Sequence, residues 1–408
     1  MIDYSPQLAW IDTQSVRMHE LLVQLAGINS WTYNLDGLDA MLSLLSEAFG
    51  ALEGVSEIVE LPAHATVDAS GNLIWKPLGK ALRIRKRPGA SVRVFLCCHA
   101  DTVYPPDHPF QTVERVDDNT LRGPGVADAK GGLVVMLKAL EALEASQRAD
   151  GIGWEVLINT DEEIGSPGSG RLLIEAAARN HLGLVFEPAL AGGDLVSARK
   201  GSGTFSAFIK GRAAHAGRDP SLGRNAVNAL ARFIVDLTQF DGTDEDVTIN
   251  VGYIEGGGPV NVVPDRAFCR FNVRVATPEG RRIFQRHLED ISEKVRQMDG
   301  IGLMLDGAFN RPPKQIDEKT LRWLESIAQC GEQLGLKIGW RPSGGACDGN
   351  NLAAAGLPTV DSLGPRGREI HTWSEFVALD SLTERAKLAA LLLLKLASGE
   401  LKPLLRLI

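Results

Sequence analysis

The sequence has few cysteines, and their spacing excludes two common uses of this residue. The chain of 408 residues contains five, namely Cys97, Cys98, Cys269, Cys330 and Cys347. Their number is odd and no pair has the C-x-x-C spacing, so the pattern predicts neither a disulfide framework nor a thiolate zinc site. We therefore expect reduced thiols and a cytoplasmic protein.

Long hydrophobic runs are also missing. The longest apolar run covers residues 388–394, far below the ~20 residues that a membrane-spanning helix needs. The first residues, MIDYSPQLAWIDTQ, lack the basic start and apolar core of a secretion signal. The sequence thus predicts no membrane partner, and residues 388–394 are better explained as part of a core-facing helix.

Blocks of basic charge are absent as well. The formal net charge is -8 and is spread along the chain, which offers no surface for nucleic acid. The hydrophobic fraction of 44% can support a large core, but 408 residues are too many for one compact domain. We expect a globular protein of two domains.

Three apolar stretches, at residues 92–98, 154–160 and 182–186, are typical of strands buried on both faces of a mostly parallel sheet. His99 and Asp101 follow the first, Glu162 and Glu163 the second, and Glu187 the third. Because ligands collect outside the carboxyl ends of parallel strands, these polar groups are expected to meet at one edge of the sheet.

The pattern changes after Ser197. Strands and helices then alternate as β-α-β-β-α-β within about 110 residues, the order of a ferredoxin-like module. We expect an α/β catalytic domain, with a mixed, mostly parallel sheet flanked by helices, at residues 1–199 and 312–408. An inserted ferredoxin-like α+β domain is expected at residues 200–311. His64, between expected strands at 58–61 and 72–76, is expected at the surface.

Five residues are candidate metal ligands: His99, Asp128, Glu163, Glu187 and His371. Nitrogen and oxygen donors of this kind hold divalent cations such as zinc. Five ligands are too many for one tetrahedral ion but suit two ions about 3.5–4 Å apart that share a carboxylate. Asp128 is the natural shared ligand, because it leaves a turn between the other strands.

The neighbours of these ligands suggest further roles. Glu162 and Glu163 diverge in an extended segment, so one can bind metal while the other acts as general base on a metal-activated water. Asp101, two residues after His99, is suited to hold the imidazole in its metal-binding tautomer.

Five motifs in this order resemble one enzyme family. They are HADTV at residues 99–103, the G-x-A-D-x-K-G-G form at 125–132, TDEEIGS at 160–166, FEP at 186–188 and HT-x-x-E at 371–375. Together they resemble the dizinc family of glutamate carboxypeptidase, acetylornithine deacetylase and succinyl-diaminopimelate desuccinylase, over almost the whole chain.

The resemblance implies two zinc sites with one shared carboxylate: His99, Asp128 and Glu187 for one ion, and Asp128, Glu163 and His371 for the other. Cobalt or manganese could substitute for zinc. The resemblance also implies that Glu162 is the general base and that the peptide bond between Asp128 and Ala129 is cis.

In the inserted domain, KGRAAHAG at residues 210–217 resembles a segment whose histidine, here His215, reaches the partner subunit's site and steadies the oxyanion. Asn261 and Arg274 resemble residues that hold the substrate's free carboxylate. Gly345 is a further predicted substrate-binding residue, and it belongs to a glycine-rich loop in which Cys347 replaces the more usual serine or threonine. A homodimer through the inserted domain is therefore expected.

The leading prediction is a zinc-dependent carboxypeptidase of the glutamate-releasing kind, which cleaves an amide next to a free carboxylate. Its substrate would be a small molecule or peptide. An N-acyl amino acid deacylase is the alternative enzyme. A metal-dependent binding module without catalysis is an alternative of another class, and the presence of Glu162 argues against it.

Overall fold

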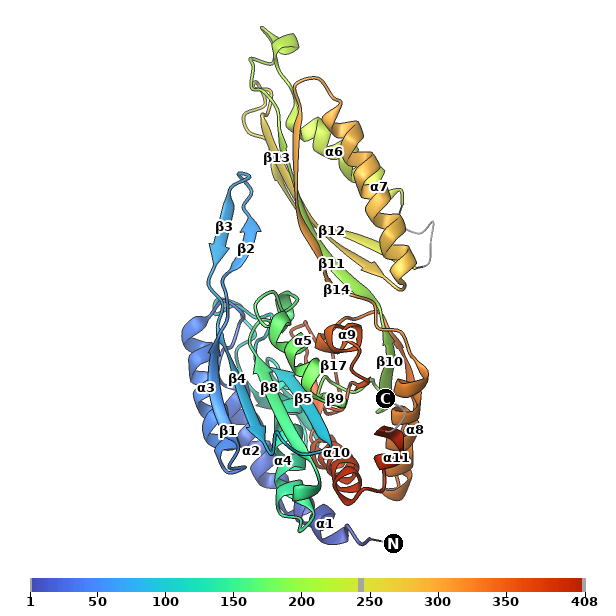
Figure 1. Ribbon diagram of the computed structural model, residues 1–408. Helices are drawn as coiled ribbons and strands as arrows, with labels where there is room; N and C mark the ends of the chain where they lie inside the picture. The colour runs from blue at the N-terminus through green and yellow to red at the C-terminus, as the bar shows by residue number, and fades with distance from the viewer. Residues whose placement is uncertain (1, 241–245, 406–408) are drawn as a thin grey trace.

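A six-stranded sheet forms the centre of the larger domain in the computed structural model, which describes residues 2–240 and 246–405 (Figure 1). In spatial order its strands are β1 (Val55–Glu60), β4 (Lys80–Lys86), β8 (Gly153–Asn159), β5 (Arg93–His99), β9 (Leu182–Val185) and β16 (Thr359–Val360). The last four run parallel, whereas β1 and β4 are antiparallel to their neighbours. The predicted mixed, mostly parallel sheet is confirmed.

Both faces of this sheet are covered, because its strands bury alternate side chains on opposite sides. In β5, Val94, Leu96 and Cys98 join one hydrophobic cluster, and Phe95 and Cys97 join another. The helices that contribute to the first cluster are α1 (Ser5–Thr13), α2 (Ser15–Ala26), α3 (Leu35–Gly50), α4 (Lys130–Glu144), α8 (Glu318–Gln333) and α10 (Asp380–Ser398). Those in the second are α5 (Gly170–Arg179) and α9 (Asp348–Ala354). Polar groups therefore gather mainly at the strand ends.

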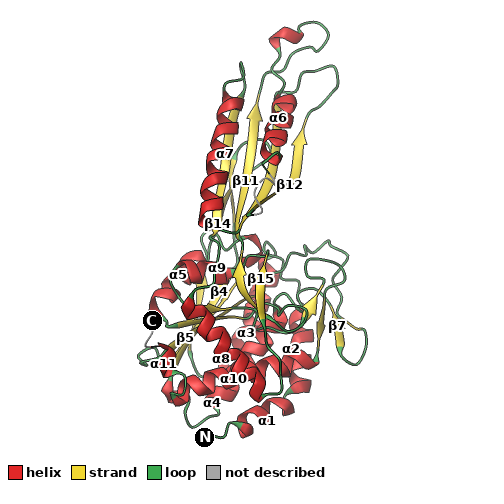
Figure 2. Cartoon of the chain, turned by 90° about the vertical axis from the view of Figure 1, so that its right-hand side faces the viewer, coloured by secondary structure: helices red, strands yellow, loops and turns green. Residues whose placement is uncertain are grey.

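The inserted domain contains a four-stranded antiparallel sheet and projects from the larger domain (Figure 1). In spatial order its strands are β12 (Val247–Gly256), β13 (Arg266–Val275), β11 (Gly201–Lys210) and β14 (Gly302–Arg311). Two helices, α6 (Ala226–Thr238) and α7 (Pro278–Arg296), lie on one face of it (Figure 2). The chain order β11-α6-β12-β13-α7-β14 confirms the predicted ferredoxin-like arrangement.

The two faces of this antiparallel sheet differ in polarity. On β11, Phe205, Ala207 and Ile209 are buried in the cluster that includes α6 and α7. Thr204 and Ser206 alternate with them and point the other way, toward the larger domain. The polar face is thus available to a binding site between the domains.

Smaller elements complete the structure. The remaining strands are β2 (His64–Val67) with β3 (Leu73–Lys76), β10 (Leu195–Arg199) with β15 (Trp340–Ser343), and β17 (Gly367–Arg368), β18 (Phe376–Ala378), β7 (Thr120–Arg122) and β6 (Glu114–Arg115). Short helices are η1 (Ala149–Gly151), η2 (Glu162–Ile164), η3 (Pro220–Leu222) and α11 (Lys402–Leu405). Among the described residues, no helix has the length and apolar character that crossing a membrane requires.

Candidate metal centre

His99 is the last residue of β5, and the fold orients its imidazole. The ring is buried, and its Nδ1 lies 3.0 Å from the carbonyl oxygen of Asp101. With the Nδ1 proton donated to this carbonyl, Nε2 keeps its lone pair and lies 3.1 Å from Asp128 Oδ1. His99 is therefore prepared to bind a cation through Nε2.

The Asp101 carboxylate contacts the backbone of the neighbouring acidic pair. It accepts the N–H groups of Glu162 and Glu163, each at 3.2 Å, and the hydroxyl of Thr32 at 2.7 Å. The orienting contact to His99 Nδ1 is made by the carbonyl of Asp101, while its carboxylate Oδ1 lies farther away, at 3.4 Å. Asp101 thus fixes both His99 and the start of η2.

Asp128 lies in the loop before α4, and its peptide bond to Ala129 is cis, as the resemblance implies. Glu375 is buried and holds this loop. Its carboxylate accepts the N–H groups of Ala127 and Asp128 at 3.0 Å each, and that of Gly125 at 3.1 Å. Glu375 therefore holds the loop that carries Asp128 in place through three backbone hydrogen bonds.

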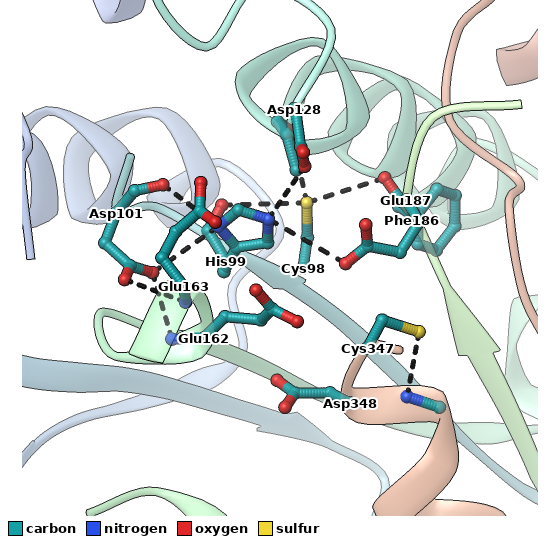
Figure 3. Close-up of polar contacts among 12 residues, drawn as sticks. Cys98, His99, Asp101, Asp128, Glu162, Glu163, Phe186, Glu187, Cys347 and Asp348 are labelled. Carbon is teal, nitrogen blue, oxygen red and sulfur yellow. Dashed lines mark hydrogen bonds and ion pairs between the residues drawn. The ribbon is translucent and has the colours of Figure 1, made fainter. Parts of the chain in front are cut away.

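Five side chains meet in two groups that share Asp128: His99, Asp128 and Glu187, and Asp128, Glu163 and His371. Within each group the ligand atoms lie within 4.8 Å of one another. His371 Nε2 is 3.3 Å from Asp128 Oδ2 and 3.1 Å from Glu163 Oε2. Figure 3 shows the carboxylates of Asp128, Glu163 and Glu187 around His99. This donor set fits two divalent cations bridged by Asp128.

The crowded negative charges of these carboxylates would also be stabilised by bound cations. Burial, together with the charge of Asp128, raises the pKa of Glu163 to about 8. Burial and the charges of Asp128 and Glu162 raise the pKa of Glu187 well above its usual value. Hydrogen bonds to Asp128 and Glu163 raise the pKa of His371 to about 11. Bound divalent cations would neutralise these crowded carboxylates and allow all of them to ionise.

Glu162 lies beside the two groups and faces Arg311. Its Oε1 is 2.8 Å from Arg311 Nη2, which also donates to the Glu162 carbonyl at 2.7 Å. Arg311 pairs in addition with Asp348 at 3.2 Å. Glu163 points instead to His371, so the two neighbouring glutamates diverge as expected. Burial raises the pKa of Glu162, which favours its acceptance of a proton.

A cleft of about 900 Å³ opens in front of these residues, with walls from both domains. Arg274 and Gly345, two of the predicted substrate-binding residues, line it. Arg274 and Arg311 are both paired with Ser202 across the antiparallel sheet, so they lie in one row. The cleft therefore places the Arg274 guanidinium near Glu162, which Arg311 contacts.

His215 and Asn261 lie away from this cleft in their own chain. They are close together, since His215 pairs with Val262 and the Asn261 carbonyl accepts the N–H of Ala216. Both follow the far ends of strands, β11 and β12, whose first residues pair with Val275 at the end of the sheet nearest the larger domain. The ten residues of β11 span about 30 Å. Figure 1 shows this tip, which includes η3, at the end of the inserted domain farthest from the larger domain.

Several residues at the site were not singled out by sequence reasoning. Arg311 and Arg199 line the cleft, and Glu375 supports Asp128. Glu375 carried a signal, because it is the last residue of the HT-x-x-E motif. The expectation that His64 lies at the surface is wrong: it is half-buried and lines the cleft, because β2–β3 folds toward the inserted sheet.

Comparison with known proteins identifies the family. The family model described as Peptidase family M20/M25/M40 matches residues 95–395. Carboxypeptidase G2 from Pseudomonas sp. (strain RS-16) is 29% identical over 387 residues, which cover 93% of this chain and 89% of that protein.

Solved structures share the fold. The di-peptidase Dug1p from Saccharomyces cerevisiae has a TM-score of 0.74 at 12% identity, over 97% of this chain and 99% of that one. The M20 family metallo-carboxypeptidase Sso-CP2 from Sulfolobus solfataricus has a TM-score of 0.69 at 17% identity, over 93% and 99%. With the family match spanning most of its length, the chain belongs to peptidase family M20/M25/M40 and is a metallohydrolase of that family.

Proposed function

We propose that the protein is a zinc-dependent carboxypeptidase that hydrolyses an amide next to a free carboxylate and prefers a terminal glutamate. The observation that carries this proposal is the cleft itself, in which two ligand groups share Asp128 while Glu162 and Arg274 stand beside them. The similarity to a carboxypeptidase over 93% of the chain supports it.

The proposed metal ligands are His99, Asp128 and Glu187 for one ion and Asp128, Glu163 and His371 for the other. Zinc suits these nitrogen and oxygen donors, with cobalt or manganese as substitutes. Bound at these residues, two such ions supply the Lewis acidity that polarises an amide carbonyl and lowers the pKa of water.

Glu162 is the proposed general base. It takes a proton from the attacking water and delivers it to the leaving amine, as a positioned carboxylate with a raised pKa can do. Arg311 and the Asp101 contacts to the backbone hold this side chain in place.

Arg274 is the proposed partner of the substrate's free carboxylate, because a guanidinium can donate two parallel hydrogen bonds to it. Gly345, which also lines the cleft, leaves room for the substrate backbone.

The remaining two site residues act across a proposed homodimer formed by the inserted domain, residues 200–311. Because His215 and Asn261 lie at the tip of that domain, we propose that they complete the site of the other subunit. His215 of the partner subunit would donate a proton to the oxyanion, and Asn261 of the partner subunit would contact the substrate carboxylate.

A substrate panel tests the activity. Zinc-loaded protein is assayed with C-terminal glutamyl, aspartyl and neutral dipeptides, and with N-acetyl and N-succinyl amino acids. We expect the highest kcat/KM on the glutamyl dipeptides. Preference for the N-acyl amino acids would overturn the carboxypeptidase in favour of a deacylase. Binding without turnover of any of these would indicate a non-catalytic module.

A further inference from the structure

One wall of the cleft consists of rows of side chains on the polar face of the inserted sheet. Paired residues of antiparallel strands point to the same side, so Arg274 and Arg311 share one row beside the catalytic centre. Another row, four residues along β13, contains Arg270, Ser206 and Asp306. Four residues of a strand rise about 14 Å. The cleft thus extends well beyond the site of the free carboxylate.

The opposite wall at this distance is the hairpin β2–β3. His64 and Lys76 are paired across the hairpin, and both line the cleft. The hairpin contacts the inserted sheet through Arg270, whose Nη2 donates to the Val67 carbonyl at 2.7 Å. Figure 1 shows the hairpin alongside β13 and β11.

The charges of this end of the cleft lie close enough to affect one another. Burial lowers the pKa of His64, the positive charges of Lys76 and Arg270 lower it further, and Asp306 acts in the opposite direction. His64 is therefore neutral at pH 7 and offers a hydrogen-bonding ring. Two full positive charges face one carboxylate, which leaves the group positive.

The two cations also keep unused donors. Lys76 Nζ lies 4.8 Å from the centre of the Tyr33 ring, and it forms no ion pair with the residues that the structure describes. Arg270 uses Nη2 for Val67 and Nε for Ser206, at 3.3 Å. Its Nη1 has no hydrogen bond within residues 2–240 and 246–405, and Asp306 pairs with neither cation there. These donors are free to bind a ligand.

We infer that Arg270, Lys76 and His64 form a subsite for a second carboxylate, carried by the acyl side of the substrate. The inference rests on the proposed function, because it takes the substrate's free carboxylate to be at Arg274. An extended peptide covers about 14 Å in roughly four residues. The cleft would therefore favour peptides with an acidic group a few residues before the cleaved bond.

A series of matched peptides tests this subsite. Each ends in glutamate, has zero to three alanines before it, and begins with an N-succinyl group or with N-succinamoyl, in which a neutral amide replaces the carboxylate. The measured quantity is the ratio of kcat/KM for the N-succinyl peptide to kcat/KM for the N-succinamoyl peptide of the same length. We expect a ratio of about ten at one spacer length and near one at the shortest, because a charged hydrogen-bonded contact is gained only at the matching length.

Substitutions in the full-length protein identify the residues. Arg270→Gln and Lys76→Gln should lower the ratio toward one, mainly through KM, whereas Asp306→Asn should raise it because it removes the opposing charge. The opposite directions separate charge recognition from damage to the fold. Arg282→Gln on α7 is the matched control, since its side chain is 60% exposed on a helix that packs against the other face of the sheet. The ratio of kcat/KM for the two peptides should be the same in Arg282→Gln as in the wild type.

Two results would separate the possible failures. A ratio near one at every spacer length, or one that Arg270→Gln and Lys76→Gln leave unchanged, would overturn the subsite while the carboxypeptidase activity stands. If the zinc-loaded wild type cleaves none of the peptides, the proposed function fails, and the subsite falls with it.

Discussion

At the scale of single residues, the site depends on side chains of one type that receive different roles from their neighbours. Glu162 and Glu163 are adjacent in sequence, yet one faces Arg311 and the other faces His371. The first belongs to neither ligand group, while the second belongs to one of them. Environment therefore separates the proposed base from the proposed ligand.

Replacing the base tests this separation. Glu162→Gln should keep both metal ions but lower kcat by about 100-fold or more, because the amide retains the shape of the side chain and cannot take a proton. The comparison is Glu163→Gln, which should lose metal as well. Metal analysis and steady-state kinetics on both variants check this, and near wild-type turnover in Glu162→Gln would show that another residue is the base.

Glu375 gives a second prediction, because it is buried against three backbone N–H groups and the Tyr104 hydroxyl, which donates at 2.9 Å. Glu375→Gln would turn an amide group toward these donors and should lower the free energy of unfolding by about 1–3 kcal/mol. The zinc affinity of the variant should also fall, because Glu375 holds the loop that carries Asp128.

The control is Tyr104→Phe, which removes one donor and keeps the carboxylate. Tyr104→Phe should lower the free energy of unfolding and the zinc affinity less than Glu375→Gln does. Urea unfolding measures the first quantity, and zinc titration measures the second. Equal losses in the two variants would contradict the role assigned to Glu375.

The sequence predicted the five candidate ligands that the structure brings together, because each stands next to a recognisable strand or motif. It did not predict the roles of Arg311 and Glu375, since their partners are far away in the chain. Arg311 is 149 residues from Glu162, and Glu375 is 247 residues from Asp128. Such pairings form only when the folded domains bring these segments together.

At the scale of elements, the same limit applies to strands. Long apolar stretches predicted β5, β8 and β9, but β4 was missed because four of its seven residues are basic. Arg83 projects from the face opposite Leu82 and Ile84 and pairs with Glu57 on β1 at 2.6 Å. When the charged residues of a strand pair with residues of another strand, the strand's own sequence looks the same as that of a polar loop.

The two connections to the inserted domain meet at one buried carboxylate. Arg199 precedes β11 and Lys314 follows β14 in the sequence. In the folded chain the side chain of Asp361 lies between these two cations. Arg199 donates to both oxygens of Asp361 at 2.8 Å, and Lys314 Nζ is 3.0 Å from Oδ2. Asp361→Asn should lower the free energy of unfolding by about 3–5 kcal/mol, because it leaves two buried cations without a counter-charge.

The pH dependence of stability follows from the same group. Although burial opposes ionisation, Arg199 and Lys314 hold the pKa of Asp361 well below its usual range. Its stabilising contribution is therefore complete above the unfolded pKa of about 3.9 and is lost as the pH falls through the folded pKa. Urea unfolding between pH 7 and pH 3 should show the beginning of this loss in the wild type, from about pH 4 downward. An equally steep loss in Asp361→Asn would contradict the assignment.

At the scale of the whole molecule, the distance between His215 and its own cleft makes a trans arrangement testable. His215→Ala and Glu162→Gln chains should each be inactive, with kcat lowered roughly 100-fold or more. A mixed dimer would contain one site with both wild-type residues, so activity should reappear after subunit exchange. Lack of recovery despite demonstrated exchange would mean that His215 does not act across subunits.

Five side chains are proposed to hold two metal ions through a shared carboxylate. The direct measurement is metal analysis of metal-free protein after equilibrium dialysis against zinc. We expect about two zinc ions per chain in the wild type, and loss of both sites in Asp128→Asn because each group needs that carboxylate. A wild type that binds one ion or none, or an Asp128→Asn variant that still binds two, would contradict it.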